Sequence, residues 1–172
     1  PGFRDVVVSY CNAMEDLALA MLPVYATALD LPAGFFTEAF REPQYTLRLS
    51  HYPYTPTLDA NEYGLAPHAD TSFMTLLAQN KIPGLSIRTA SGRWIEAPVI
   101  EGAFLVNSGQ MLNRWSNGRF RATPHRVTNK SGGDRYAIPF SSTAISITRW
   151  FACRHAPTRQ IRRNSSRRPI RN

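Results

Sequence analysis

The residues best suited to chemistry are His68 and Asp70, one residue apart, and a distant third, His125. Two imidazole nitrogens and one carboxylate oxygen can occupy one face of an octahedral Fe(II) ion, which leaves the opposite face open for oxygen and a co-substrate. This ligand set is typical of non-haem iron oxygenases. We therefore predict that His68, Asp70 and His125 bind a metal ion and are the catalytic residues.

The spacing of these residues sets a condition on the fold. Residues i and i+2 of an extended chain point to the same side, so His68 and Asp70 can reach one ion from a single strand edge. His125 lies 55 residues beyond Asp70 and must come from a strand that folds back beside the first. A histidine and an aspartate at this spacing are also common in ordinary loops, and the pair alone favours that plainer interpretation.

Arg135 strengthens the case for a site. It opens a strand-like run, residues 135–140, ten residues after His125. A guanidinium there can hold a dicarboxylate through two parallel hydrogen bonds.

Composition favours one globular domain without a membrane span. The chain has 172 residues, of which 43% are hydrophobic, and no apolar run reaches the ~20 residues that cross a bilayer. No signal peptide is visible at the start, and two cysteines, Cys11 and Cys153, make no disulfide framework, so we expect a cytoplasmic protein. Because the first residue is Pro1 and not methionine, we expect a fragment or a processed product.

The net charge of +8 comes from one end of the chain. Residues 1–140 hold 12 basic and 12 acidic residues, whereas residues 141–172 hold eight arginines and no acid. The basic balance therefore describes a tail, and it predicts no specific nucleic-acid binding by the domain. By composition we expect residues 141–172 to be disordered.

The pattern of apolar residues divides the chain into three parts. Residues 1–44 are predicted to be helical, because apolar side chains recur at spacings of three and four over residues 5–29, with a kink at Pro23. A further short helix is expected over residues 32–40. The next part, residues 45–140, is expected to hold short strands at 45–52, 73–78, 85–88, 94–95, 103–106, 126–127 and 136–140. Between the first two of these, Pro53, Pro56 and Pro67 predict loop. We expect the large aromatic residues Trp94, Phe104, Trp115 and Phe120 in the core. This order predicts a mainly β fold with N-terminal helices, a sandwich or double-sheet jelly roll.

Residues 48–140 resemble the iron(II)- and 2-oxoglutarate-dependent dioxygenases of the isopenicillin N synthase-like superfamily. The similarity lies in seven words that follow the family's order: residues 48–53 (Arg-Leu-Ser-His-Tyr-Pro), 67–72 (Pro-His-Ala-Asp-Thr-Ser), 82–85 (Ile-Pro-Gly-Leu), 92–95 (Gly-Arg-Trp-Ile), 104–109 (Phe-Leu-Val-Asn-Ser-Gly), 120–127 (Phe-Arg-Ala-Thr-Pro-His-Arg-Val) and 135–140 (Arg-Tyr-Ala-Ile-Pro-Phe).

The resemblance implies a double-stranded β-helix, a jelly-roll barrel that is incomplete in this chain. It implies that Fe(II) binds to His68, Asp70 and His125, and that Arg135 and Tyr52 hold 2-oxoglutarate. The implied activity is hydroxylation or desaturation of a small organic substrate with O2, releasing succinate and CO2. The family usually places a Ser or Thr where this chain has Ala137, so a hydrogen bond to the co-substrate worth ~1.5–3 kcal/mol is missing there.

Three alternatives stay open. The first is an oxidase of the same fold that needs no 2-oxoglutarate, against which Arg135 argues. The second is an inactive, truncated or frameshifted family member, since residues 141–172 lack the family's sequence pattern. With one choice of codons, translation of this segment in a shifted reading frame gives a family-like amino-acid sequence. The third is a binding protein with a basic tail. The sequence leaves the substrate and the oligomeric state open.

Overall fold

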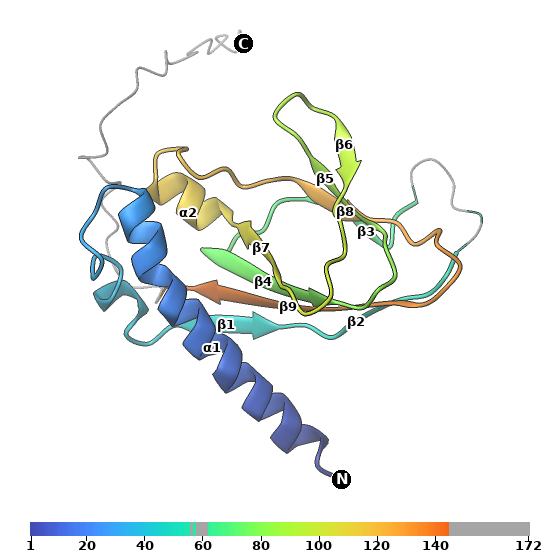
Figure 1. The fold of residues 1–172 in the computed structure, drawn as a ribbon, viewed down its shortest axis with the longest axis horizontal. Coiled ribbons are helices and arrows are strands. Elements are labelled where there is room, and N and C mark those ends of the chain that lie inside the picture. Colours follow the sequence, from blue (N-terminus) through green and yellow to red (C-terminus); the bar gives the residue numbers. More distant parts are fainter. Residues whose placement is uncertain (56, 58–61, 145–172) are drawn as a thin grey trace, which may run out of the picture.

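The computed structural model describes residues 1–55, 57 and 62–144, and it is mainly β, with two sheets that face each other (Figure 1). The helices are α1 (Phe3–Ala28), the 3-10 helix η1 (Glu38–Phe40) and α2 (Gln110–Trp115). The strands are β1 (Gln44–Leu47), β2 (Ser50–Tyr52), β3 (Leu65–His68), β4 (Met74–Gln79), β5 (Leu85–Arg88), β6 (Trp94–Glu96), β7 (Leu105–Ser108), β8 (His125–Val127) and β9 (Arg135–Thr143).

Every strand pairing among the described residues is antiparallel. One sheet has the order β1-β9-β4-β7, with β2 also paired to β9, and the other has the order β3-β8-β5-β6. Within the described ranges these sheets do not close into a barrel. The predicted fold class, an incomplete jelly roll preceded by helices, is confirmed.

Strand β9 organises the first sheet because its two faces have different neighbours. Side chains of successive strand residues point to opposite faces. Phe140 and its cross-strand partner Leu76 are fully buried in a cluster with α1 and α2, whereas the odd-numbered residues from Arg135 to Thr143 line a cavity on the other face. The same strand therefore anchors the helices and forms one wall of the space between the sheets.

Helix α1 lies across the outer face of that sheet (Figure 1). Its buried residues, Cys11, Met14, Ala18, Leu22, Tyr25 and Ala26, recur at the predicted spacing of three and four, and the helix continues through Pro23. At its end Arg119 donates hydrogen bonds to the carbonyl oxygens of Ala28 and Leu29 and pairs with Asp30. A cation at a helix C-terminus satisfies carbonyls that have no partner within the helix.

The space between the sheets has its own smaller apolar cluster. Leu85, Ala97 and Val127 are buried there, and partly buried side chains from both sheets pack against them, namely Tyr52, Leu65, Leu77, Ile87 and Leu105. This cluster holds the second sheet against the first, so it sets the distance between side chains that face each other across the gap.

Several expectations about single elements were wrong. The region of Pro53, Pro56 and Pro67, predicted to be loop, contains β3, and the predicted strand 45–52 is two strands that both pair with β9. Phe104, expected in the core with Trp94, Trp115 and Phe120, is 40% exposed because it precedes β7 at the sheet edge. Helix α2 was not predicted. Disorder was predicted for residues 141–172, but strand β9 continues to Thr143. Residues 145–172 of that segment lie outside the described part.

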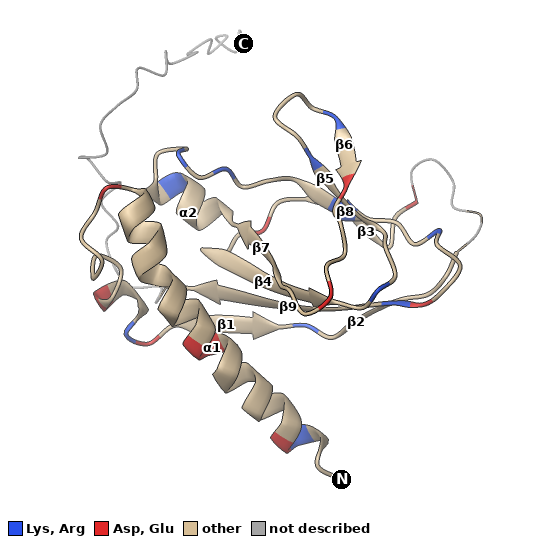
Figure 2. Cartoon of the chain, in the orientation of Figure 1, with Lys and Arg blue, Asp and Glu red and all other residues tan. Residues whose placement is uncertain are grey.

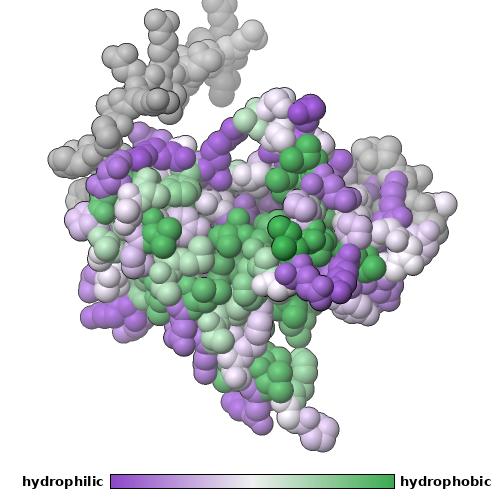
Figure 3. Space-filling view, viewed as in Figure 1, coloured by the Kyte–Doolittle hydropathy of each residue, from purple (hydrophilic) through white to green (hydrophobic). Residues whose placement is uncertain are grey.

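The charges of the described part are mixed in sign over helices, strands and loops (Figure 2). Figure 3 shows hydrophobic residues over the middle of the face that α1 crosses. The exposed apolar side chains of the described part include Phe3, Val6 and Val24 on α1 and Val106 on β7. Among residues 1–55, 57 and 62–144, no helix is long and apolar enough to cross a bilayer.

Replacing Gly109 with alanine should destabilise the fold near the predicted metal ligands. A Cβ at Gly109 would overlap the carbonyl of Ser72, in the loop that follows Asp70. We expect Gly109→Ala to lower the free energy of unfolding by about 1–3 kcal/mol, as overpacking usually does, measured by urea denaturation. Gly34→Ala is the matched control, since a Cβ there meets only the Thr37 hydroxyl at an ordinary 3.6 Å. Equal effects of the two substitutions would contradict this prediction.

Candidate functional site

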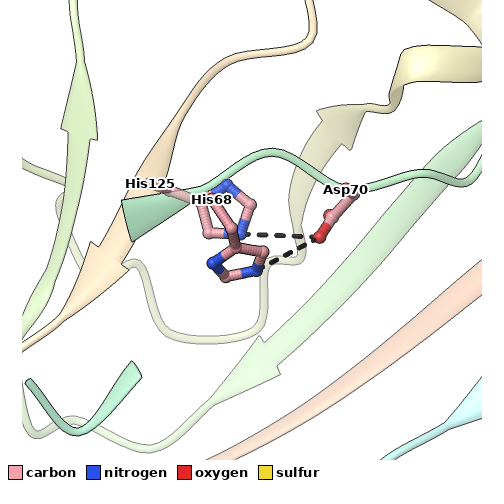
Figure 4. Close-up of side chains that lie close together, drawn as sticks. All are labelled: His68, Asp70 and His125. Carbon is pink, nitrogen blue, oxygen red and sulfur yellow. Dashed lines mark ion pairs between the residues drawn. The ribbon is translucent and has the colours of Figure 1, made fainter. Parts of the chain in front are cut away.

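The three side chains singled out by the sequence lie together in the structure (Figure 4). His68 and His125 are directly opposite each other in the antiparallel pair β3–β8, and Asp70 follows β3 by two residues. The Nε2 atoms of both imidazoles lie 3.6 Å from Oδ1 of Asp70. One possible ligand atom from each residue lies within 4.8 Å of the others, a spacing that a single metal ion can bridge.

Backbone carbonyls fix how both imidazoles are presented. Nδ1 of His68 lies 2.9 Å from the carbonyl oxygen of Ala66, and Nδ1 of His125 lies 3.1 Å from that of Thr123. A carbonyl can only accept a hydrogen bond, so Nδ1 of each ring is the donor and Nε2 is the ring nitrogen that faces Asp70. An imidazole held in this way can offer the lone pair of Nε2 to a metal ion, so these two nitrogens and the Asp70 carboxylate form a set of ligands that one cation can bind.

Asp70 is held from the side of strand β7 and helix α2. Asn107 donates from Nδ2 to Oδ2 of Asp70 at 2.9 Å, which leaves Oδ1 facing the imidazoles. The backbone N–H of Gln110 donates to the Asp70 carbonyl at 2.7 Å. The close approach of Gly109 to Ser72 lets this turn lie against the Asp70 loop. Hydrogen bonds to a ligating carboxylate orient it and raise metal affinity.

Arg135 is a buried cation with unused donors. It is 1% exposed, and its guanidinium donates from Nη2 to Oε1 of Gln79 at 2.9 Å. Nε and Nη1 are buried and have no hydrogen-bond partner. Burial lowers the pKa of Arg135, which the neighbouring Tyr52 opposes, but arginine is basic enough to stay charged at neutral pH. Unpaired buried donors of a cation are costly unless a ligand accepts from them.

A cavity of about 490 Å³ joins Arg135 to the three converging side chains. Such a volume suits a small molecule. One wall is the inner face of the first sheet, including the row Thr46, Ser141, Thr75 and Asn107 that runs across four strands. The other wall comes from β3, β8 and β5 of the second sheet, whose residues include His68 and His125.

Two other predicted contact residues border the same cavity. Tyr52 is half-buried, and its ring centroid lies 5.1 Å from Cζ of Arg135. Ala137 is buried two residues along β9 from Arg135, and its cross-strand partners are Ser50 and Gln79. The methyl group of Ala137 can shape the cavity but donates no hydrogen bond. His51 lies outside the cavity and pairs with Asp134 at 3.0 Å.

Two residues that support the site had no predicted role. Asn107 belongs to the family-like motif at residues 104–109, and Gln79 directly follows the predicted strand 73–78. Each acts on a residue far away in the chain, Asp70 and Arg135, so only the pairing of β4 with β7 and β9 reveals them. A polar residue that ends an otherwise apolar strand, as Gln79 does in β4, was the available signal.

Residues 43–144 match the model of the 2OG-Fe(II) oxygenase superfamily. The match covers more than half of the 172 residues, and the chain therefore belongs to that family, which confirms the predicted resemblance. Fe(II) and 2-oxoglutarate, expected from the sequence as cofactors, are the groups in the family's description.

The relatives are oxidoreductases of greater length. The 2-oxoglutarate-Fe(II) type oxidoreductase hxnY of Emericella nidulans is 37% identical over 141 residues, which are 80% of this chain and 40% of the relative. The chain thus spans less than half the length of the curated relatives it matches.

Two solved structures show the same likeness. A full-length Neurospora crassa protein in complex with alpha-KG and thymine has a TM-score of 0.79 and 26% identity, covering 83% of this chain and 46% of that one. JOX2 in complex with 2OG, Fe and JA has a TM-score of 0.78 and 30% identity, covering 86% of this chain and 44% of that one. Both structures therefore share the fold of this chain over most of its length.

Removing the Gln79 amide, which accepts a hydrogen bond from Arg135, should destabilise the unliganded protein. Gln79→Leu takes away a hydrogen bond to a buried charge, and we expect the free energy of unfolding to fall by about 1.5–3 kcal/mol, measured by urea denaturation. Gln44→Leu, on the exposed strand β1, is the control and should change little. If the Gln79 variant is as stable as the Gln44 variant, the hydrogen bond does not hold Arg135 in place.

Proposed function

We propose that this protein is an Fe(II)- and 2-oxoglutarate-dependent dioxygenase that hydroxylates or desaturates a small organic substrate, releasing succinate and CO2. The observation that carries the proposal is the convergence of two imidazole nitrogens and a carboxylate oxygen in a cavity that also holds a buried arginine with two unused donor atoms. Because the chain covers less than half of its relatives, the proposal concerns the whole protein.

His68, Asp70 and His125 are the residues that would hold the iron. Imidazole nitrogen and carboxylate oxygen are donors that Fe(II) accepts, and three ligands on one face leave positions free for a co-substrate and O2. When bound, the iron supplies oxygen activation coupled to decarboxylation of 2-oxoglutarate. Hydrogen bonds with Ala66, Thr123 and Asn107 orient the two imidazoles and the Asp70 carboxylate toward one another.

Arg135 would bind the carboxylate of 2-oxoglutarate that lies far from the metal. Its free Nε and Nη1 can donate two parallel hydrogen bonds to one carboxylate, the geometry in which arginine binds such groups best. Gln79 fixes the guanidinium from the other side, and Tyr52 and Ala137 border the space that the co-substrate would fill. These contacts favour the dioxygenase over an oxidase that needs no 2-oxoglutarate.

The partner that we propose is a small molecule. The Neurospora crassa structure is a complex with alpha-KG and thymine and the JOX2 structure one with 2OG, Fe and JA, and a cavity of about 490 Å³ has a size suited to small molecules. We also propose a cytoplasmic location, because the buried Cys11 is a free thiol, as is usual in a reducing compartment.

The metal site is tested by removing one imidazole. We expect His125→Ala to abolish stoichiometric Fe(II) binding, because two ligands cannot hold the ion as three do, measured by anaerobic metal titration. His51→Ala is the matched control, since His51 pairs with Asp134 at the surface and lies outside the cavity. Unchanged iron content in the His125 variant would remove this residue from the site.

The co-substrate site is tested at Arg135. Arg135→Gln should raise the Kd for 2-oxoglutarate about ten- to hundredfold, the loss expected for a charge-assisted pair, and leave Fe(II) binding intact. Arg114→Gln, on α2 and outside the cavity, is the control. Succinate formed in step with substrate oxidation would separate the dioxygenase from the oxidase. An Arg135 variant with unaltered affinity for 2-oxoglutarate would contradict the assigned role.

A further inference from the structure

A second arginine, Arg48, lies on the wall of the same cavity. Leu47 packs on the core below the sheet, and side chains alternate along a strand, so the next residue faces the opposite side. The backbone N–H of Arg48 donates to the carbonyl of Pro139, a cavity residue of β9. Pro139 lies four residues from Arg135, which places the two arginines about 13 Å apart along the strand.

The environments of these two arginines differ. Arg135 is buried and held by Gln79, whereas Arg48 is exposed and lies in the segment that joins β1 to β2 (the basic segment between them in Figure 2). From Arg48 toward the end of β9 the wall carries the hydroxyl groups of Thr46, Ser141 and Thr143. The first sheet therefore gives the cavity a polar wall on this side of Arg48.

In a cavity that holds Fe(II) and 2-oxoglutarate, the formal charges cancel except for that of Arg48. Among its described lining residues the formally charged ones are Asp70, Arg135 and Arg48, and a histidine that binds a metal ion does so as a neutral imidazole. The two positive charges of Fe(II) and that of Arg135 equal the two negative charges of 2-oxoglutarate and that of Asp70. Arg48 is left as a single, solvent-exposed positive charge on the cavity wall.

We propose that Arg48 is a specificity-determining residue that binds the carboxylate of the substrate, so that the protein acts on small organic acids. This inference rests on the proposed function, because it assigns Arg135 to 2-oxoglutarate. The guanidinium of Arg48 donates to the substrate carboxylate, and the hydroxyl of Thr46 on the same wall can bond to a further polar group of that molecule. A neutral analogue of the acid loses the charge-assisted pair with Arg48.

The test measures binding without turnover. The full chain is loaded anaerobically with Fe(II) and 2-oxoglutarate and titrated by calorimetry with matched pairs of probes, phenylacetate against phenylacetamide and cyclohexylacetate against cyclohexylacetamide. We expect at least one acid to bind about tenfold or more tightly than its amide, the difference expected for one charge-assisted pair. Arg48→Gln should remove that difference, and Arg48→Lys should restore part of it. Arg41→Gln, an exposed arginine paired with Glu38, is the control.

The outcomes separate the inference from the function on which it rests. In the Arg48→Gln variant the Kd for 2-oxoglutarate should stay within about twofold, less than the loss of one charged pair. If that Kd rises as it does in Arg135→Gln, Arg48 serves the co-substrate and the inference is overturned. Acids that bind no better than their amides, or that bind the variant equally well, overturn it too. An unmodified chain that fails to bind Fe(II) and 2-oxoglutarate overturns the proposed function as well.

Discussion

The site depends on the antiparallel pairing of β3 with β8, which brings His68 opposite His125 although they lie 57 positions apart in the chain. Register in a sheet is strict, because a slip of one residue turns every side chain of a strand to the other face. A slip here would point one imidazole out of the cavity. The apolar side chains that hold β8 in place, Val127 against Leu65 and Leu85, therefore maintain the geometry of the histidines as well as the core.

In the other sheet, strand β9 positions Arg135 and the cavity wall. Phe140 ties it to the core beneath α1 and α2, and its odd-numbered residues form the cavity wall from Arg135 to Thr143. A buried cation such as Arg135 would destabilise an isolated fold, since desolvation of a charge is unfavourable and two of its donor atoms are unpaired. We infer that this unfavourable arrangement is retained for binding, because an anion that fills the cavity satisfies those donors and becomes more tightly held as a result.

Much of this arrangement could be predicted from the sequence, and the failures have physical causes. The strand 85–88 and the first helix follow from alternation and from spacings of three and four, which report directly on burial. Strand β3 was missed because Pro67 suggested a loop, but β3 lies at the edge of its sheet, where a proline is tolerated. The support of Asp70 by Asn107 and of Arg135 by Gln79 could not be predicted, because each is a contact between segments that are distant in the sequence. The family-like sequence motifs indicated the three converging side chains, and the structure was needed to reveal the hydrogen bonds that orient them.

The central claim is that one ferrous ion is shared by His68, Asp70 and His125. The most direct measurement is a crystal structure of the protein grown anaerobically with Fe(II) and 2-oxoglutarate, with anomalous scattering recorded at the iron edge. The account predicts a single iron peak in bonding contact with Nε2 of both histidines and a carboxylate oxygen of Asp70. An iron peak elsewhere, or imidazoles turned away from a common point in the presence of iron, would contradict it.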